Sequence, residues 1–252
     1  MQLVDQLREL RRNILRDFST QVSGNSDQLW SDETLVNYIG DAEKRFARAT
    51  FILRDADTPA ITQVTLQTGV SRYLLHPSVL SVISARYDVD SFDLKRIGRS
   101  LVAELAPSDT LFFDPSNYAP LSPGRPTAVS TDEMLSFQNA AAAAMVVYPA
   151  PSSVENGKQV FLRVARAPLR VYTLDTLDSV SEISDDYVYD VLRWAAYRAM
   201  SNHDADAADP VDANAHKMAF DEAVERCKDD LRSRLLSNTQ FVFGTNAFSW
   251  VR

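Results

Sequence analysis

The sequence predicts an α+β fold: a helical bundle formed by N- and C-terminal helices, a β-rich middle insertion and an extended C-terminal arm. Apolar residues recur at helical spacing near both ends of the chain, and they alternate with a period of two through its middle. The last residues follow neither period. The predicted parts are 1–57 and 181–237 for the bundle, 58–180 for the β-rich region and 238–252 for the arm.

Composition restricts the class of protein. The 252 residues are 45% hydrophobic and 10% aromatic, which is ample for a packed core. The formal net charge of −8 argues against a surface that grips phosphates, because tight binding of nucleic acid needs clustered Lys and Arg. A single cysteine, Cys227, excludes an intrachain disulfide and a cysteine-rich metal site. No secretory signal is visible, and the longest apolar run, 140–148, is too short to cross a bilayer.

Two amphipathic helices are predicted at the start of the chain. The first is expected to end at the turn signal 23–26, and its arginines are expected to form a solvated face. Its apolar positions are Leu3, Leu7, Leu10, Ile14 and Phe18, and its arginines are Arg8, Arg11, Arg12 and Arg16. The second begins at Ser31 as N-cap and ends at Thr58, because Pro59 lacks an N–H and disfavours helix in the residue before it.

The middle of the chain is predicted to be rich in strands. Segments 61–66, 73–75 and 79–87 are expected to form a β-meander. Segments 127–130 and 143–148 are further strands, although the alanines of the second could also seed a helical turn. Asn156 and Gly157 both tolerate positive φ and predict a turn, with 160–164 as the partner strand. The proline-containing stretch 92–126 predicts an ordered surface loop that includes a short helix at 101–105.

The best-signalled helix is predicted at 184–200. Ser184 is its expected cap, and Asp185 and Asp186 favour the positive end of the helix dipole. Its small residues, Ala195, Ala196 and Ala199, leave room for the close approach of another helix, and Trp194 and Tyr197 widen the contact on either side. We expect this helix to pack on the helices around Phe46 and Val224, each of which also has an apolar stripe.

The last predicted helix follows an acidic segment. The cluster at 203–209 invites a calcium site, but its spacing lacks the glycine and the distal glutamate of a calcium loop. The preferred interpretation is that Asp209 caps the helix and Pro210 opens it. Cys227 lies on the apolar stripe of this helix, which predicts a small buried hydrophobic residue rather than a nucleophile.

Catalytic and cofactor motifs are absent from the sequence. The glycines form neither a dinucleotide-binding fingerprint nor a phosphate loop, and His76, His203 and His216 lack zinc-binding spacing. The sequence therefore predicts a protein without enzymatic activity, cofactor or metal. Two alternatives stay open. A hydrolase could gather His203 and Asp206 in a polar pocket, and a small regulatory or DNA-binding protein could use the arginines of the first helix.

Several short motifs occur in one particular order along the chain. They are Trp30-Ser31-Asp32-Glu33-Thr34-Leu35, Thr58-Pro59-Ala60-Ile61, Tyr73-Leu74-Leu75, Tyr148-Pro149-Ala150-Pro151, Arg166-Ala167-Pro168-Leu169, Leu192-Arg193-Trp194-Ala195-Ala196-Tyr197 and Asp209-Pro210. In this order, from about Trp30 to about Val224, the chain resembles the head-to-tail adaptor proteins of tailed bacteriophages. The stretch 92–126 and the aromatic arm depart from that pattern.

The resemblance implies a structural virion protein. It implies a homo-oligomeric ring, a dodecamer, that docks beneath the portal protein and continues the DNA channel to a tail nozzle or tail terminator protein. Genomic DNA would pass through without specific binding, which agrees with an acidic chain, because an acidic lining repels phosphates. The resemblance also implies no contact with a membrane. Assembly would take place in the host cytoplasm, and the finished protein would lie at the head-tail junction of the virion.

The arm is the predicted partner-binding segment. Its residues Phe241, Val242, Phe243, Phe248, Trp250 and Arg252 are expected to bind the portal or a neighbouring subunit. Aromatic side chains of this density are unusual on a free end, and protein interfaces select them as energetic centres. The alternative is that the arm folds back and covers the bundle of its own subunit.

Overall fold

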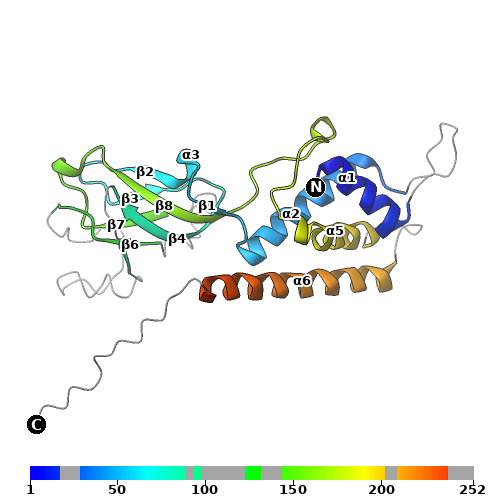
Figure 1. Cartoon of the computed structure of the whole chain (residues 1–252). Helices are drawn as coiled ribbons and strands as arrows, with labels where there is room; N and C mark the ends of the chain where they lie inside the picture. The colour runs from blue at the N-terminus through cyan, green and yellow to red at the C-terminus, as the bar shows by residue number, and fades with distance from the viewer. Residues whose placement is uncertain (18–28, 89–92, 98–122, 132–143, 202–208, 238–252) are drawn as a thin grey trace, which may run out of the picture. The chain divides into compact units, whose positions relative to one another are not determined.

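The computed structural model describes residues 1–17, 29–88, 93–97, 123–131, 144–201 and 209–237 (Figure 1). It confirms the α+β class. The chain divides into two compact units, a helical unit of Met1–Ala42 with Tyr172–Arg252 and a sheet unit of Glu43–Val171. The finer division of the sequence into a bundle, a β-rich region and an arm stays a prediction.

Two helical segments begin the helical unit, α1 (Leu3–Glu9) and a π-helical continuation, η1 (Leu10–Leu15). Arg16 follows with a left-handed φ of 55°. The first helix therefore ends earlier than the sequence predicted, because a left-handed residue breaks the i to i−4 ladder. The expected end at 23–26, and Phe18, lie outside the described residues.

The second helix, α2 (Asp32–Thr50), starts as predicted. The hydroxyl of Ser31 accepts a hydrogen bond from the Thr34 N–H at 3.1 Å. Its predicted end at Thr58 was wrong: the helix ends at Thr50, and Phe51 takes a left-handed φ of 55°. Pro59 instead opens a short helix, α3 (Pro59–Thr62), which suits a residue without an N–H.

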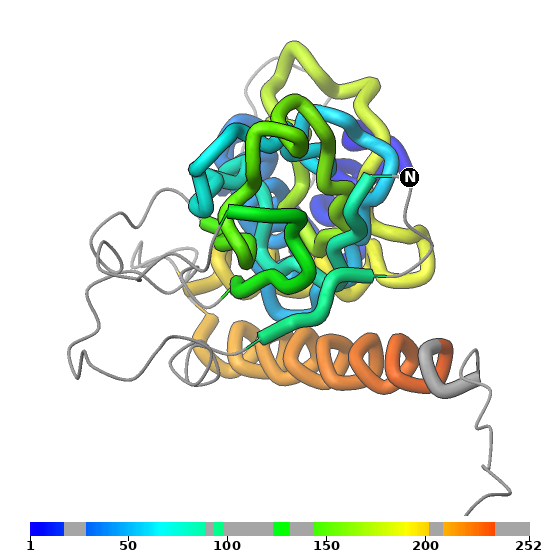
Figure 2. Tube along the Cα trace, turned by 90° about the vertical axis from the view of Figure 1, so that its left-hand side faces the viewer, coloured from blue at the N-terminus to red at the C-terminus, as the bar shows by residue number. Residues whose placement is uncertain are grey.

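Helix α5 (Asp185–Met200) occupies the predicted position, but Ser184 does not cap it as expected. The Ser184 hydroxyl donates to Asp186 at 3.1 Å and caps no backbone N–H. Helix α6 (Pro210–Ser237) starts as predicted, with Asp209 accepting from the N–H groups of Val211 and Asp212, both at 3.1 Å. Figure 2 shows α6 as one uninterrupted helix. None of the helices in the described part of the chain is long and apolar enough to span a membrane.

The sheet unit contains two sheets, and its longest strand, β8 (Gln159–Arg166), organises the first of them. One edge of β8 pairs with β1 (Arg54–Asp55) and β2 (Gln63–Thr65), and the other edge pairs with β4 (Val79–Tyr87), all antiparallel. The second sheet has the order β3 (Arg72–Leu74), β7 (Ala144–Tyr148), β6 (Ala128–Ser130) and β5 (Lys95–Arg96).

This topology corrects the predicted meander. Strands β2 and β4 both pair with β8, and β3 between them in sequence pairs with β7 in the other sheet. Cross-strand packing favours this pairing, because the buried residues Val82, Ala85 and Tyr87 of β4 lie opposite the buried residues Val164, Leu162 and Val160 of β8. Residues 144–148 form β7, as predicted, and the alanines before Ala144 lie outside the described residues. Most of 92–126 lies outside the described residues.

The turn before β8 keeps its predicted place with a different conformation. Gly157 has a φ of 82°, whereas Asn156 has a φ of −63°. Only the glycine therefore uses the left-handed region. A short 3-10 helix, η4 (Ser153–Glu155), leads into the turn. The buried core of this unit is made of Ile61, Leu66, Tyr73, Leu75, Val79, Val82, Ala85, Tyr87, Leu94, Val129, Met145, Val147, Val160, Leu162 and Val164.

Candidate functional site

The predicted partner-binding residues Phe241, Val242, Phe243, Phe248, Trp250 and Arg252 all lie outside the described residues. The acidic segment 203–206 lies outside them too. In the part of the chain that the structure describes, no group of His, Cys, Asp and Glu is placed to hold a metal ion. The described surfaces that a partner could contact belong to the helical unit and to the sheet unit.

Helix α5 lies at the centre of the helical unit, where it packs on α6 and η1. Its indole, Trp194, is 8% exposed and lies 5.2 Å from the Phe220 ring of α6 between centroids. Ala195, Ala196 and Ala199 are fully buried, as expected for residues that allow close helix approach. The predicted packing of α5 on the helix around Val224 is confirmed, and its packing near Phe46 stays a prediction.

Polar pairs also join α5 to α6. Tyr187 donates its hydroxyl proton to Asp230, and Arg226 forms an ion pair with Asp190. Burial raises the pKa of Tyr187, and its hydrogen bond to Asp230 adds to the shift. The pKa of Asp190 is also raised by burial, against the opposing charge of Arg226. These pairs run antiparallel along the two helices, so they fix the register of α5 on α6.

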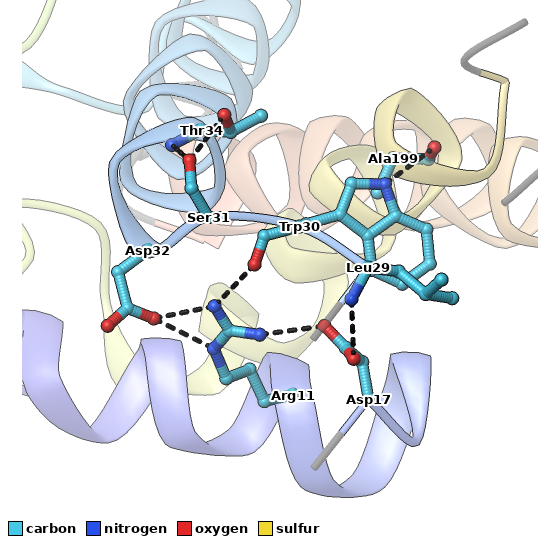
Figure 3. A network of polar contacts seen from close by, with 8 residues as sticks. All are labelled: Arg11, Asp17, Leu29, Trp30, Ser31, Asp32, Thr34 and Ala199. Carbon is cyan, nitrogen blue, oxygen red and sulfur yellow. Dashed lines mark hydrogen bonds and ion pairs between the residues drawn. The ribbon is translucent and has the colours of Figure 1, made fainter. Parts of the chain in front are cut away.

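Arg11 is the polar centre at the other end of this unit (Figure 3). Its guanidinium donates to Asp17 at 2.7 Å, to Asp32 at 2.6 and 2.8 Å, and to the Trp30 carbonyl at 2.7 Å. Its side chain is 9% exposed and that of Asp17 is 4% exposed. The expectation that all four arginines form a solvated face is therefore wrong at Arg11, whereas Arg8, Arg12 and Arg16 are exposed.

Trp30 extends this network to the end of α5 (Figure 3). Its indole N–H donates to the Ala199 carbonyl at 3.2 Å, where the last turn of a helix leaves carbonyls unpaired. Asp17 also accepts from the Leu29 N–H at 3.1 Å. One buried guanidinium and one indole thus hold together the end of η1, the start of α2 and the end of α5.

The sheet unit has its own buried ion pair. Asp55 accepts from Arg166 at 2.8 Å and from the N–H and hydroxyl of Thr58 at 3.0 and 2.8 Å. Burial opposes the charged form of Asp55, but these hydrogen bonds outweigh it and lower the pKa to about 2. The pair therefore closes the turn after β1 onto the end of β8.

One face of the β8 sheet carries exposed arginines. Phe161 and Arg163 alternate with buried residues along β8. The register places Arg86 of β4 opposite Phe161 and Arg54 of β1 opposite Ala165. The three exposed residues Arg54, Arg86 and Arg163 therefore share the outer face of this sheet, which we call the basic face. The Arg86 guanidinium also lies 5.8 Å from the centre of the Phe161 ring.

The helical unit presents the opposite charge. Residues 172–186, called the acidic loop below, carry Asp175, Asp178, Glu182, Asp185 and Asp186 and no Lys or Arg. Over whole units, Lys plus Arg and Asp plus Glu number 12 and 22 in the helical unit, a net charge of −10. They number 14 and 12 in the sheet unit, a net charge of +2. The acidity of the chain therefore resides in one unit.

The acidic loop is tied to the start of the chain. The N–H groups of Leu3 and Val4 donate to the carbonyls of Ser179 and Leu177 at 2.8 and 3.0 Å, and Ser181 donates to Met1 at 3.0 Å. These bonds hold the loop beside α1, near the N-terminus in Figure 1. Within the loop, Leu174 and Val180 are each 45% exposed.

Comparison with known families gives one match across most of the chain. A family model described as SU10 adaptor protein matches residues 3–240. The matched range takes in all the helices of the helical unit and the whole sheet unit. No curated protein matches the chain.

Proposed function

Because the chain belongs to the SU10 adaptor protein family, whose members are phage head-to-tail adaptors, we propose that it forms a ring beneath the portal and continues the DNA channel to the tail. The protein is thus a structural component of a bacteriophage virion. The observation that carries the proposal is the match from residue 3 to residue 240, which agrees with the ordered motifs of the sequence.

The proposed ring is a dodecamer of identical subunits. Helices from both ends of the chain would form one bundle in each subunit, as the pairing of α5 with α6 and η1 supports. Its partners would be the portal protein on one side and a tail nozzle or tail terminator protein on the other. The net charge of −8 supports passage of DNA without specific binding, because phosphates are repelled by an acidic lining.

The arm at 238–252 is proposed to bind the portal. Its four aromatic residues, Phe241, Phe243, Phe248 and Trp250, offer the anchor side chains that interfaces use as energetic centres. Gly244 lets the segment bend between them. Folding-back of the arm onto its own subunit is the alternative that the experiment must separate from portal binding.

The experiment combines negative-stain images with two variants of the arm. The full chain mixed with its portal is expected to show rings attached to the portal, and deletion of residues 238–252 is expected to abolish attachment at nearly unchanged thermal stability. Replacing Phe241, Phe243 and Trp250 by serine should act like the deletion. Replacing the polar residues Asn238, Thr239 and Gln240 of the same arm by alanine is the matched control and should leave binding intact.

Two results would contradict this proposal. A chain without residues 238–252 that unfolds at a lower temperature but still binds the portal would assign the arm to its own subunit. A full chain that forms no ring with the portal under any condition would refute the ring itself.

A further inference from the structure

The basic face carries three arginines and one carboxylate, because an isolated antiparallel bridge places Asp93 beside Arg86. Arg163 lies diagonally between Arg86 and Arg54 in the register of β4, β8 and β1. Diagonal neighbours on one face of a sheet lie within reach of long side chains, and like charges there destabilise each other. The uncharged residues that the register places on this face include Gln63, Thr65, Ser81, Ser84, Gln159 and Phe161. Three arginines and one aspartate leave this face with a net charge of +2, which an external acidic partner would neutralise.

The acidic loop has the complementary composition. Asp175 and Asp178 are exposed, and the exposed side chains Leu174 and Val180 lie among the carboxylates. The basic face likewise combines charge with an apolar centre, since Phe161 is half-buried beneath Arg86. Matched potentials of this kind steer association and set its register.

The acidic loop also has a fixed shape. A 3-10 turn, η5 (Leu174–Thr176), is closed by a capping box between Thr173 and Thr176. The strand-like contact of Gln2 with Val180 and the backbone bonds of Leu3 and Val4 hold the rest of the loop. A loop that is already ordered loses little conformational entropy on binding, which favours its use as a docking element.

We propose that the acidic loop of one copy docks on the basic face of a second copy of this chain. The inference rests on the proposed function, because the contact joins two different surfaces, and repetition of such a head-to-tail contact closes a ring. The second copy is the chosen occupant because the two surfaces belong to units of net charge −10 and +2 within one sequence. Every copy therefore carries both halves of the contact.

The test uses two charge-reversal variants of the full chain. Arg86→Glu with Arg163→Glu makes both surfaces acidic, whereas Asp175→Lys with Asp178→Lys places two lysines on the acidic loop and reduces its net charge from −5 to −1. Sedimentation velocity should show self-association of the natural sequence at low salt, where the Debye length is about 30 Å, and its loss near 1 M salt, where it is about 3 Å. Each variant alone should associate at least about tenfold more weakly than the natural sequence.

Mixing the two variants is the decisive measurement. The lysine loop of one then meets the glutamate face of the other, while the remaining loop and face keep their natural charges, so association should return. A chain that combines all four substitutions should also associate with itself. The matched controls are Lys95→Glu with Arg96→Glu on β5 and Asp221→Lys with Glu222→Lys on α6, and both should associate like the natural sequence. If the glutamate face fails to fold, Arg86→Gln with Arg163→Gln should still weaken association.

Three outcomes would overturn the inference: a natural sequence that stays monomeric at low salt, a mixture that does not regain association, or a basic face whose reversal abolishes binding of duplex DNA and leaves association unchanged. Failure of the mixture to associate, together with recovery of the natural unfolding midpoint in the four-substitution chain, would place the contact within one copy. If rings still form on the portal in any of these cases, the proposed function stands and only this contact is wrong. Restored association without any portal ring would instead refute the proposed function.

Discussion

Replacing Arg11 by alanine is expected to lower the free energy of unfolding of the helical unit by about 3–5 kcal/mol. The substitution leaves the carboxylate of Asp17, whose side chain is 4% exposed, without its guanidinium partner. The Leu29 N–H would remain as a hydrogen-bond donor to that carboxylate. Loss of the contact to Asp32 adds less than about 1 kcal/mol, because that side chain is 51% exposed and screened by water.

The assay is urea unfolding followed by tryptophan fluorescence. Trp30 and Trp194 are buried in the helical unit, and the sequence of the sheet unit contains no tryptophan, so the change on unfolding reports the helical unit. Arg12→Ala is the matched control, because Arg12 is exposed and one position away, and it should change the free energy of unfolding by less than about 0.5 kcal/mol. Arg11→Met combined with Asp17→Leu should recover much of the loss, since both charges are then absent.

An Arg11→Ala protein as stable as the Arg12→Ala protein would refute this reasoning. It would show that the buried ion pair in Figure 3 contributes nothing to the stability of the unit. A double variant as unstable as Arg11→Ala would point instead to lost packing of the arginine side chain.

Two further predictions concern the packing of α5 and the carboxyl group of Asp55. Trp194→Ala should cost about 3–5 kcal/mol in the same unfolding assay. Tyr189→Ala, at an exposed position of the same helix, is the control. An unchanged unfolding midpoint for the Trp194 variant would show that the indole is not part of the core. The pKa of Asp55 falls from 3.8 to about 2, so the charged form stabilises the sheet unit by about 2 kcal/mol above pH 5 and this contribution disappears as the pH falls toward 2. Circular dichroism of thermal unfolding should show a smaller loss between pH 5 and pH 2 for Asp55→Asn than for Asp57→Asn, and equal losses would contradict the assignment.

Local signals located most of the secondary structure. Ser31 and Asp209 cap helices through atoms only a few residues away, so a short window of sequence contains the cause. Alternation of apolar residues placed β4 and β8, and the buried Cys227 follows from its place in a helical stripe. Helix ends were less accurate at Arg16 and Phe51, where left-handed residues of no special type end the helices.

The candidate surfaces needed more than local signals. The aromatic arm was found from composition alone, and it lies outside the described residues. The basic face could not be found that way, because Arg54, Arg86 and Arg163 are far apart in the sequence. Only the register of β1, β4 and β8 brings them onto one face.

By itself, the sequence determined the α+β class, the main helices, the acidity of the chain and, through the order of its motifs, the adaptor family. Tertiary structure decided which strands pair and which charges are buried. Arg11 lies one position from the exposed Arg12 in a run of arginines, yet it reaches Asp32 across a separation of 21 residues. Helix periodicity gives the direction of a side chain, but the partner that makes burial of a charge tolerable comes from distant parts of the chain.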